Sequence, residues 1–340
     1  MRQPPRRARL DDGRLHLQDG PIDLIVGAFG VEAQIARAEA AAWARFETVL
    51  DELCAELPLL RAPAGPGAPR PAGPVARRMA AAVAPFAGAV FVTPMAAVAG
   101  AVADEILAAM TQAAPLRRAY VNNGGDIALH LAPGERFCVG MIDRPDRPGA
   151  FGRATIASES PVRGIATSGW RGRSFSLGIA DAVTVLAADA AAADAAATLI
   201  ANAVDLPGHP AVRRAPARDF DPQSDLGDRP VTRAVGALDA AEIEAALDAG
   251  RREAERLRRA GLIVAAAIHL QGETCASASP PRAGDRETVA AAGPGSGSAR
   301  RGAGTLTRPI PDPSPLCGEG RSRRFDLRSP VAANKACRRS

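Results

Sequence analysis

Aromatic side chains are scarce in this 340-residue chain, which contains nine Phe, two Trp and one Tyr. The core must therefore be built mainly from Ala, Val, Ile and Leu, and apolar residues together make up 47% of the sequence. Such a composition excludes a disordered chain and is typical of a globular protein. It also predicts helices that pack closely through small side chains.

The usual signatures of metal-thiolate, zinc and hydrolase sites are missing. The five cysteines are odd in number and include no CxxC pair, which argues against a disulfide framework and against a thiolate metal site. The four histidines show neither HxxxH nor HExxH spacing, so we predict no zinc site. No serine occurs in a GxSxG context, so covalent hydrolase chemistry is unsupported.

Long apolar runs are absent as well. No stretch of about 18 residues is apolar and free of charge, so the sequence predicts no membrane span. The N-terminal sequence MRQPPRRARLDDGR is basic but leads into polar residues, not into the apolar core of a signal peptide. We therefore expect a cytoplasmic protein with no membrane partner.

The net charge of +5 is distributed unevenly along the chain. Residues 276–340 carry +7, whereas residues 1–275 carry −2. Because a nucleic-acid-binding domain needs a basic surface, this distribution predicts no nucleic-acid partner for the main body.

Hydrophobic periodicity predicts an α+β fold, with a mixed or antiparallel sheet and Ala-rich packed helices in one large domain over residues 14–275. We expect helices at 31–57, 75–83, 95–110, 190–204 and 238–259. We expect strands at 22–26, 89–92, 119–121, 127–131, 137–142, 154–157, 163–167, 182–187 and 262–270. Residues 1–13 are expected to be flexible, the Pro/Gly-rich segment 61–74 to form a surface loop, and residues 276–340 to form a disordered basic tail.

Three segments carry candidate ligand-binding residues. The first is NNGGD, which comprises Asn122, Asn123, Gly124, Gly125 and Asp126 between two predicted strands. A tight hairpin needs Asn and Gly for its turn in any case. The same five residues, however, combine amide groups, accessible backbone N–H groups and a carboxylate, which favours a ligand site.

The second segment is GIATSGWRGRS, in which a predicted strand runs into Thr167, Ser168 and Gly169 and then into Trp170 and two arginines. Hydroxyl groups, an indole ring and guanidinium groups are suited to a phosphate-bearing aromatic ligand. An exposed polar turn would have the same composition, so both interpretations stay open.

The third segment is a helix of mostly Ala in which Asp194, Thr198 and Asn202 recur every four residues and so lie along one stripe. Such a stripe faces either solvent or a hydrated cation in a cleft. A carboxylate and a hydroxyl one turn apart are suited to Mg²⁺, which takes few protein ligands and completes its shell with water and phosphate.

Taken in order, AVAGAVADEIL, YVNNGGDIALHL, GIATSG and VTVLA followed by ADAAAT resemble the ApbE-type FAD:protein FMN transferases, and more closely an uncharacterised family allied to them. The resemblance covers roughly residues 14–275. It implies that Mg²⁺ bridges the pyrophosphate of FAD and that FMN passes to a Thr hydroxyl of an acceptor protein. It also implies that Asp194 and Thr198 bind the metal, together with a backbone carbonyl near Val98, and that the GGD and TSG residues shape the nucleotide site.

Two features depart from the transferase pattern. Val98, Ala99 and Gly100 stand where those enzymes have Ala-Lys-Gly, so the lysine is missing. The sequence SFSLGIADA also replaces the family's His-containing segment.

The leading interpretation is therefore a Mg²⁺-dependent flavin nucleotide enzyme that acts at a pyrophosphate, with FAD as its expected cofactor and an acceptor protein as an expected partner. The main alternative is an enzyme or binding protein on the same scaffold for a different phosphorylated or nucleotide ligand, without FMN transfer. A structural or interaction protein is the third interpretation. No single catalytic residue and no oligomeric state is indicated.

Overall fold

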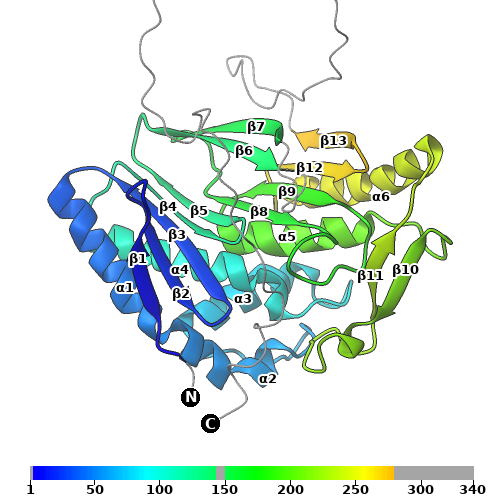
Figure 1. Cartoon of the computed structure of the whole chain (residues 1–340), viewed down its shortest axis with the longest axis horizontal. Helices are drawn as coiled ribbons and strands as arrows, with labels where there is room; N and C mark the ends of the chain where they lie inside the picture. The colour runs from blue at the N-terminus through cyan, green and yellow to red at the C-terminus, as the bar shows by residue number, and fades with distance from the viewer. Residues whose placement is uncertain (1–2, 143–149, 279–340) are drawn as a thin grey trace, which may run out of the picture.

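A computed structural model describes residues 3–142 and 150–278 of the chain. Over these ranges the fold is α+β, as the sequence predicts: an extended antiparallel sheet is covered on one face by long helices (Figure 1). Most of the predicted tail, from residue 279 onward, lies outside the described residues.

The main sheet contains nine strands, and every pairing between them is antiparallel. In sheet order the strands are β1 (Arg6–Arg9), β2 (Leu15–Asp19), β3 (Ile22–Phe29), β4 (Arg118–Asn123), β5 (Asp126–Leu131), β8 (Gly164–Ser168), β9 (Ala182–Ala187), β12 (Ala265–Leu270) and β13 (Glu273–Ala278). Two separate ribbons are formed by β6 (Arg136–Ile142) with β7 (Ala150–Ala157) and by β10 (Val212–Pro216) with β11 (Pro230–Val235).

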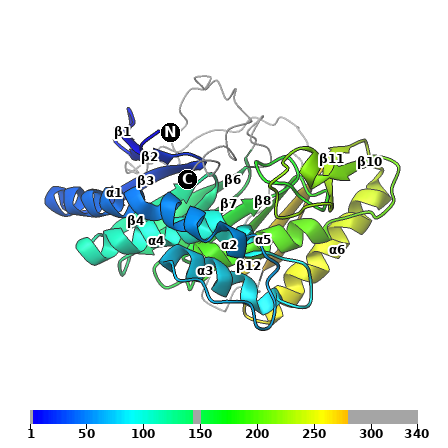
Figure 2. The same ribbon diagram turned by 90° about the horizontal axis from the view of Figure 1, so that it is seen from below.

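Four helices pack against the same face of the sheet, and a fifth lies outside them (Figure 2). The packed helices are α1 (Glu32–Ala55), α4 (Val98–Ala113), α5 (Ala190–Ala203) and α6 (Ala240–Arg259), and the outer helix is α3 (Pro74–Val83). The remaining short elements are α2 (Leu57–Leu60) and three 3₁₀ turns, η1 (Ala84–Phe86), η2 (Pro94–Ala97) and η3 (Ala217–Asp219).

The opposite face of the sheet carries a smaller apolar cluster. Strand β5 alternates between the faces: Leu129 and Leu131 enter this cluster with Phe137 and Ile156 of the β6–β7 ribbon, whereas Ala128 enters the main core below the helices. This alternation is the two-residue period of a strand buried on both sides.

Close helix packing depends on small residues, as the composition predicts. A Cβ atom added at Gly100 of α4 would lie 2.2 Å from the carbonyl oxygen of Ala190, at the start of α5. A Cβ atom at Gly164 of β8 would lie 1.9 Å from the carbonyl oxygen of Asp189. The two glycines therefore let α4 and β8 approach the start of α5, next to the candidate site.

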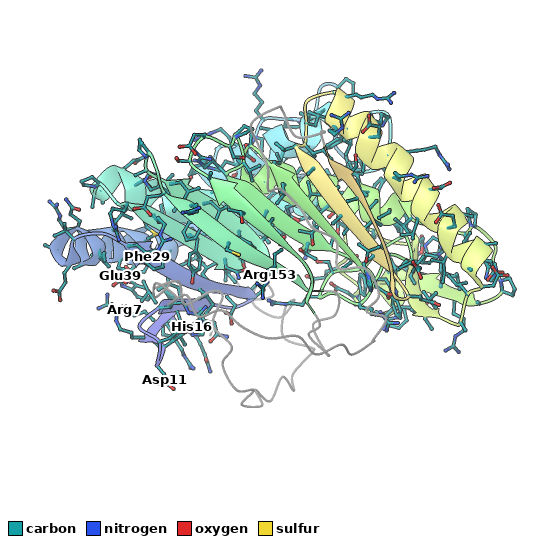
Figure 3. All side chains as sticks on the ribbon, turned by 90° about the horizontal axis from the view of Figure 1, so that it is seen from above. Arg7, Asp11, His16, Phe29, Glu39 and Arg153 are labelled. Atoms are coloured by element: carbon teal, nitrogen blue, oxygen red, sulfur yellow. The ribbon has the colours of Figure 1, made fainter. Side chains whose placement is uncertain are left out.

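Three local expectations need correction. Residues Arg6–Arg9, expected to be flexible, form strand β1 at one edge of the sheet. Figure 3 shows Arg7 and Asp11 at this edge. The strand was not predictable from periodicity because an edge strand with the sequence RRAR has no apolar alternation, and charged edges of this kind discourage further pairing. The domain also continues past residue 275, because β13 runs to Ala278.

The strand expected at 89–92 is absent, and this segment is irregular. Val92 is buried and its carbonyl accepts a hydrogen bond from the N–H of Ala64, whereas Val90 is 45% exposed. A short apolar run can fill a core position from a loop as well as from a strand, and periodicity does not separate the two.

One segment of the described chain, Pro94–Ala113, is long and apolar enough to cross a membrane by length and composition alone. Half of its most apolar window is buried inside the structure, where α4 packs between α1 and α5. Core helices of globular domains also satisfy this criterion.

Candidate functional site

The NNGGD segment forms the turn between β4 and β5. Gly124 and Gly125 have φ values of +68° and +117°, which only glycine adopts readily, and the side chain of Asn122 accepts a hydrogen bond from the N–H of Gly125 at 2.8 Å. The buried Asn123 donates instead to the carbonyl of Ala99, 3.2 Å away in the first turn of α4. The positive φ values of the turn thus account for the two glycines, and Asn123 links the turn to the start of α4.

Asp126 follows the turn and joins the first candidate segment to the second. Its Oδ1 accepts a hydrogen bond from the backbone N–H of Thr167, at the end of β8, at 3.3 Å. The hydroxyl of Thr167 lies 3.0 Å from that of Thr184 on β9. Ser168 ends the strand and Gly169 begins the loop that follows, so both predicted segments meet at one end of the sheet.

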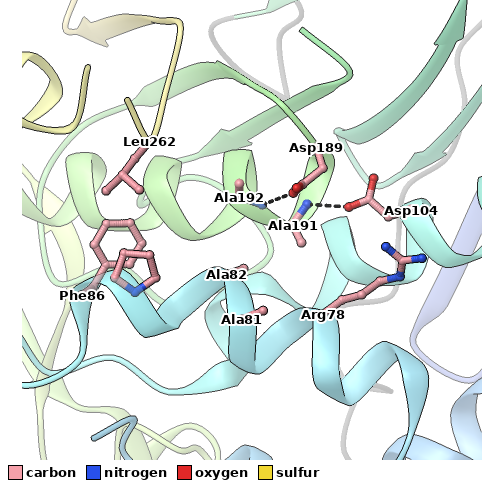
Figure 4. A pocket seen from close by; sticks show the side chains of 10 residues that line it. Arg78, Ala81, Ala82, Phe86, Asp104, Asp189, Ala191, Ala192 and Leu262 are labelled. Atoms are coloured by element: carbon pink, nitrogen blue, oxygen red, sulfur yellow. Dashed lines mark hydrogen bonds between the residues drawn. The ribbon is translucent and has the colours of Figure 1, made fainter. Parts of the chain in front are cut away.

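Asp194 connects α5 to α4. Its Oδ2 accepts a hydrogen bond from the N–H of Gly100 at 3.0 Å. In the reverse direction, Asp104 of α4 accepts hydrogen bonds from the N–H groups of Ala190 and Ala191 at 3.1 and 2.9 Å, and Figure 4 shows the one from Ala191. Each helix therefore supplies a carboxylate to N–H groups of the other, an arrangement that satisfies donors left unpaired at helix starts.

A cavity of about 250 Å³ lies beside Asp104 and the start of α5, between α3 and Leu262 (Figure 4). Burial raises the pKa of Asp104 to about 6, against the effect of its two backbone hydrogen bonds. Because Asp104 and the capping residue Asp189 already accept hydrogen bonds from α5, we assign the cavity no ligand.

Asp126 and Asp194 are close enough to interact electrostatically. Burial raises the pKa of Asp126 to about 7, although the N–H of Thr167 and the charge of Arg173 act in the opposite direction. Burial raises the pKa of Asp194 well above its usual value, the charge of Asp126 raises it further, and the hydrogen bond from Gly100 lowers it. Two carboxylates from different elements thus interact, and the negative charge of one disfavours ionisation of the other.

The polar stripe on α5 does not face open solvent. Asp194, Thr198 and Asn202 are all only partly exposed. Asn202 accepts a hydrogen bond from the N–H of Leu177 at 2.9 Å and from the hydroxyl of Ser176 at 3.3 Å, both in the loop between β8 and β9. The stripe therefore runs from the carboxylate pair at one end to this loop at the other.

Within the same loop, Asp181 fixes two of the predicted ligand-binding side chains. This buried carboxylate accepts hydrogen bonds from the indole of Trp170 at 3.1 Å and from Nε of Arg171 at 2.6 Å. A Cβ atom at Gly169 would lie 2.4 Å from the Asp181 carbonyl oxygen, so this glycine is required for packing. These contacts give Trp170 and Arg171 a structural role that sequence reasoning did not anticipate.

Arg173 is the arginine directed toward the carboxylate pair. Its side chain is exposed and donates to the carbonyl of Pro21 at 3.3 Å. A Cβ atom at Gly124 would lie 3.2 Å from its Nη1. Arg173 thus lies against the NNGGD turn, and its positive charge lowers the pKa of Asp126.

Val98 is the first residue of α4, two residues before Gly100. Its carbonyl is positioned to accept an intrahelical hydrogen bond. A carbonyl oxygen has two lone pairs, so this bond leaves one lone pair for a metal ion. The described residues contain no group of three or more His, Cys, Asp or Glu arranged to hold a metal ion. A metal here would therefore need mixed ligands, and the roles of Val98 and Thr198 stay predictions.

Asp126 and Asp194 are 68 positions apart, and no pattern in the sequence predicts that their charges interact. The NNGGD, TSG and Asp194 segments nonetheless converge around the start of α4. A family model described as "AbpE bacteria" matches residues 7–276 of this chain.

The chain belongs to this ApbE-related family.

The matched range includes most of β1 and most of β13, which agrees with the observed extent of the sheet. Curated relatives of this ApbE-related chain include proteins named UPF0280 protein. The one from Methanosphaerula palustris is 40% identical over 128 residues, that from Methanopyrus kandleri 42% over 111, and that from Archaeoglobus fulgidus 39% over 116. The matches cover 35, 33 and 33% of this chain and 49, 43 and 45% of the respective relatives. The chain thus spans about half the length of the curated relatives it matches.

Proposed function

We propose that this ApbE-related protein binds a flavin nucleotide through its diphosphate and a Mg²⁺ ion, and acts at the pyrophosphate. Asp126 and Asp194 are the proposed charged ligands of the metal, with Thr198 as a neutral ligand one helical turn from Asp194. The resemblance implies for Asp126 only a role in the nucleotide site, and its electrostatic interaction with Asp194 is our reason for adding it to the proposed metal ligands.

The proposal is carried by two carboxylates from different elements, Asp126 and Asp194, each of which accepts a backbone hydrogen bond and has a pKa raised by burial. Two such groups close together destabilise each other unless a proton or a cation lies between them. Carboxylate and hydroxyl oxygens suit Mg²⁺, which keeps several waters and binds substrate phosphates alongside one or two carboxylates. The residues present therefore fit the metal.

The bound ion would supply charge neutralisation at the phosphate oxygens and orient the diphosphate for displacement. The chain itself supplies the remaining contacts. Arg173 adds an exposed positive charge beside the NNGGD turn. A Cβ atom at Gly125 would meet no heavy atom within 4 Å, so a phosphate can approach the backbone there.

A second candidate function is binding, or chemistry, of a different phosphorylated ligand on the same site. Ala99 in place of the family's lysine, and the sequence SFSLGIADA in place of its His-containing segment, favour this candidate. Neither change removes the carboxylate pair, so Mg²⁺-dependent binding of phosphate is common to both candidates.

Thermal unfolding of the full chain with FAD, FMN, ADP or inorganic pyrophosphate, each with and without Mg²⁺, tests the proposal. A ligand that binds only the folded state raises the melting temperature. We expect FAD with Mg²⁺ to raise it by several degrees, and FAD or Mg²⁺ alone to raise it less. A response to ADP or pyrophosphate without one to FAD would select the second candidate, and no Mg²⁺-dependent response at all would contradict both.

A further inference from the structure

A basic groove of about 590 Å³ lies between α6 and the last strand of the sheet, β13. The strand contributes Ala276 and Ser277 to its lining, and the helix contributes one glutamate and four arginines, which are Glu255, Arg251, Arg252, Arg256 and Arg259. The lining therefore carries a charge of +3, although residues 1–275 together carry −2. We refer to this feature as the arginine groove.

A side-chain contact joins the two walls of the groove. The hydroxyl of Ser277 donates a hydrogen bond to Glu255 at 3.2 Å, and Glu255 also accepts from Arg258 and Arg259 at 2.7 and 2.8 Å. Ser277 is buried and so marks the side of β13 that faces α6. The groove therefore has one wall from a helix and one from a strand at the edge of the sheet.

The edge of β13 is suited to the addition of a further strand. Within the described residues, β13 pairs only with β12 and ends the sheet on the side opposite to β1 (Figure 1). An edge strand presents unpaired N–H and C=O groups, and charges within the strand discourage further pairing. Strand β1 has the sequence RRAR, whereas β13 has the sequence ETCASA, in which Glu273 is the only charge. The charges at this edge thus lie on the helix beside the strand and not on the strand itself.

The arginines of the groove are available to a ligand, since all four are exposed. Three of them pair with carboxylates three or four residues away on the same helix, as Arg256 does with Glu253. Exposed pairs of this kind contribute little free energy, so an incoming carboxylate can compete for them. Arg252 forms no ion pair within residues 3–142 and 150–278.

Charge and backbone chemistry select the occupant. Residues 276–340 of the chain itself carry +7 and would be repelled. A second copy that paired through its own β13 would bring its α6 to the same face of the joined sheet, where arginines would oppose arginines. A nucleic acid lacks the alternating N–H and C=O groups that pair with a strand edge. An acidic segment of another protein meets none of these obstacles.

We propose that an extended acidic segment of a partner protein docks here as an additional strand beside β13, with Asp or Glu at every second position against the arginine groove. Side chains two residues apart lie on one face of a strand, which sets this spacing. Main-chain hydrogen bonds to the edge supply affinity, and the arginines select for negative charge. The surface uses none of the residues proposed to bind the nucleotide or the metal, so the inference is independent of the proposed function.

Fluorescence anisotropy of the full chain with a labelled peptide tests the proposal. The probe has about eight residues, a typical strand length, in which Glu alternates with Thr. The variant is Arg252→Glu, and the matched control is Arg37→Glu, which reverses an exposed arginine on α1, the helix that packs on β2 and β3 near the opposite edge. We expect Arg252→Glu to weaken binding of the peptide at least fivefold and Arg37→Glu to leave it unchanged.

Two further peptides separate the charge from the backbone. One carries Lys in place of Glu, and the other keeps Glu but is N-methylated at its two central residues, which removes N–H donors on both of its edges. We expect each to bind wild type at least tenfold more weakly than the parent peptide.

No binding of the parent peptide to wild type, or equal affinity for wild type and Arg252→Glu, would overturn the proposal. Equal binding of the N-methylated peptide would show that no strand is added. Equal or tighter binding of the Lys peptide would favour the chain's own basic residues as the occupant, and a wild-type dimer in sedimentation that excludes the peptide would favour a second copy. Tighter, Arg252-dependent binding of single-stranded DNA would assign the groove to nucleic acid. Each of these results contradicts an acidic partner strand.

Discussion

Among single residues, the buried carboxylates determine how the free energy of unfolding of the metal-free protein depends on pH. Asp126, Asp194 and Asp104 all have pKa values raised by burial, so between about pH 4 and pH 7 the folded state holds protons that the unfolded chain has released. A state that binds more protons loses stability as the pH rises. The carboxylates therefore reduce the free energy of unfolding of the metal-free protein across this window.

This loss of stability with rising pH gives a prediction for Asp194→Asn. Asparagine keeps an oxygen that can accept the hydrogen bond from Gly100 and removes the charge that repels Asp126. At pH 7.5 without metal, we expect the variant to be more stable than wild type by on the order of 1 kcal/mol, and less so at pH 4.5. Urea unfolding at both pH values measures this difference. Parallel stability profiles for the two proteins would show that Asp194 does not titrate in the way described.

At the scale of elements, the site depends on how closely α4 approaches the start of α5. Gly100→Ala places a Cβ atom 2.2 Å from a backbone oxygen of α5, which neither helix can relieve by a rotamer change. Although Ala is the better helix former by about 1 kcal/mol, we expect a net destabilisation of about 1 to 3 kcal/mol from the clash. Chemical denaturation measures it, and Gly65→Ala is the control because a Cβ atom there meets nothing within 4 Å. Equal effects of the two substitutions would refute the close approach.

The elements differ in how far the sequence predicts them. Helices α1 and α6 were predicted within two residues at each end, because apolar residues repeat at helical spacing along both segments. Strand β13, with the sequence ETCASA, carries no apolar alternation and is defined only by its pairing with β12. Edge pairing of this kind is a tertiary effect and leaves no local pattern.

The candidate site likewise combines features that a local sequence pattern predicts with features that depend on tertiary contacts. Asp194 and Thr198 were identified from their spacing on one helix, which is local information. The contact of Asp194 with Gly100, its interaction with Asp126, and the capture of Arg171 by Asp181 join residues that only the folded sheet brings together. Periodicity cannot report such pairs, and the resemblance predicted the participating segments without the geometry between them.

At the scale of the whole molecule, the family match and the sheet end within two residues of each other, at residues 276 and 278. Residues 279–340 show no apolar periodicity in the sequence. We therefore expect a chain ending at Ala278 to melt within about 2 °C of the full chain, because a segment without an apolar face adds nothing to the core. Differential scanning calorimetry of the two proteins measures this. A truncated chain that melts several degrees lower would show that residues beyond 278 complete the fold.

Calorimetric titration of FAD with and without Mg²⁺ tests whether Asp126 and Asp194 form a Mg²⁺ site for the diphosphate of a nucleotide. The proteins to compare are wild type, Asp194→Asn and Asp189→Asn. The last is the control, because it removes the same charge from the start of the same helix and keeps a good capping residue. Such a site predicts that Mg²⁺ strengthens FAD binding to wild type and to Asp189→Asn, and that Asp194→Asn binds at least tenfold more weakly, about 1.4 kcal/mol. Indistinguishable isotherms for wild type and Asp194→Asn in the presence of Mg²⁺ would contradict it.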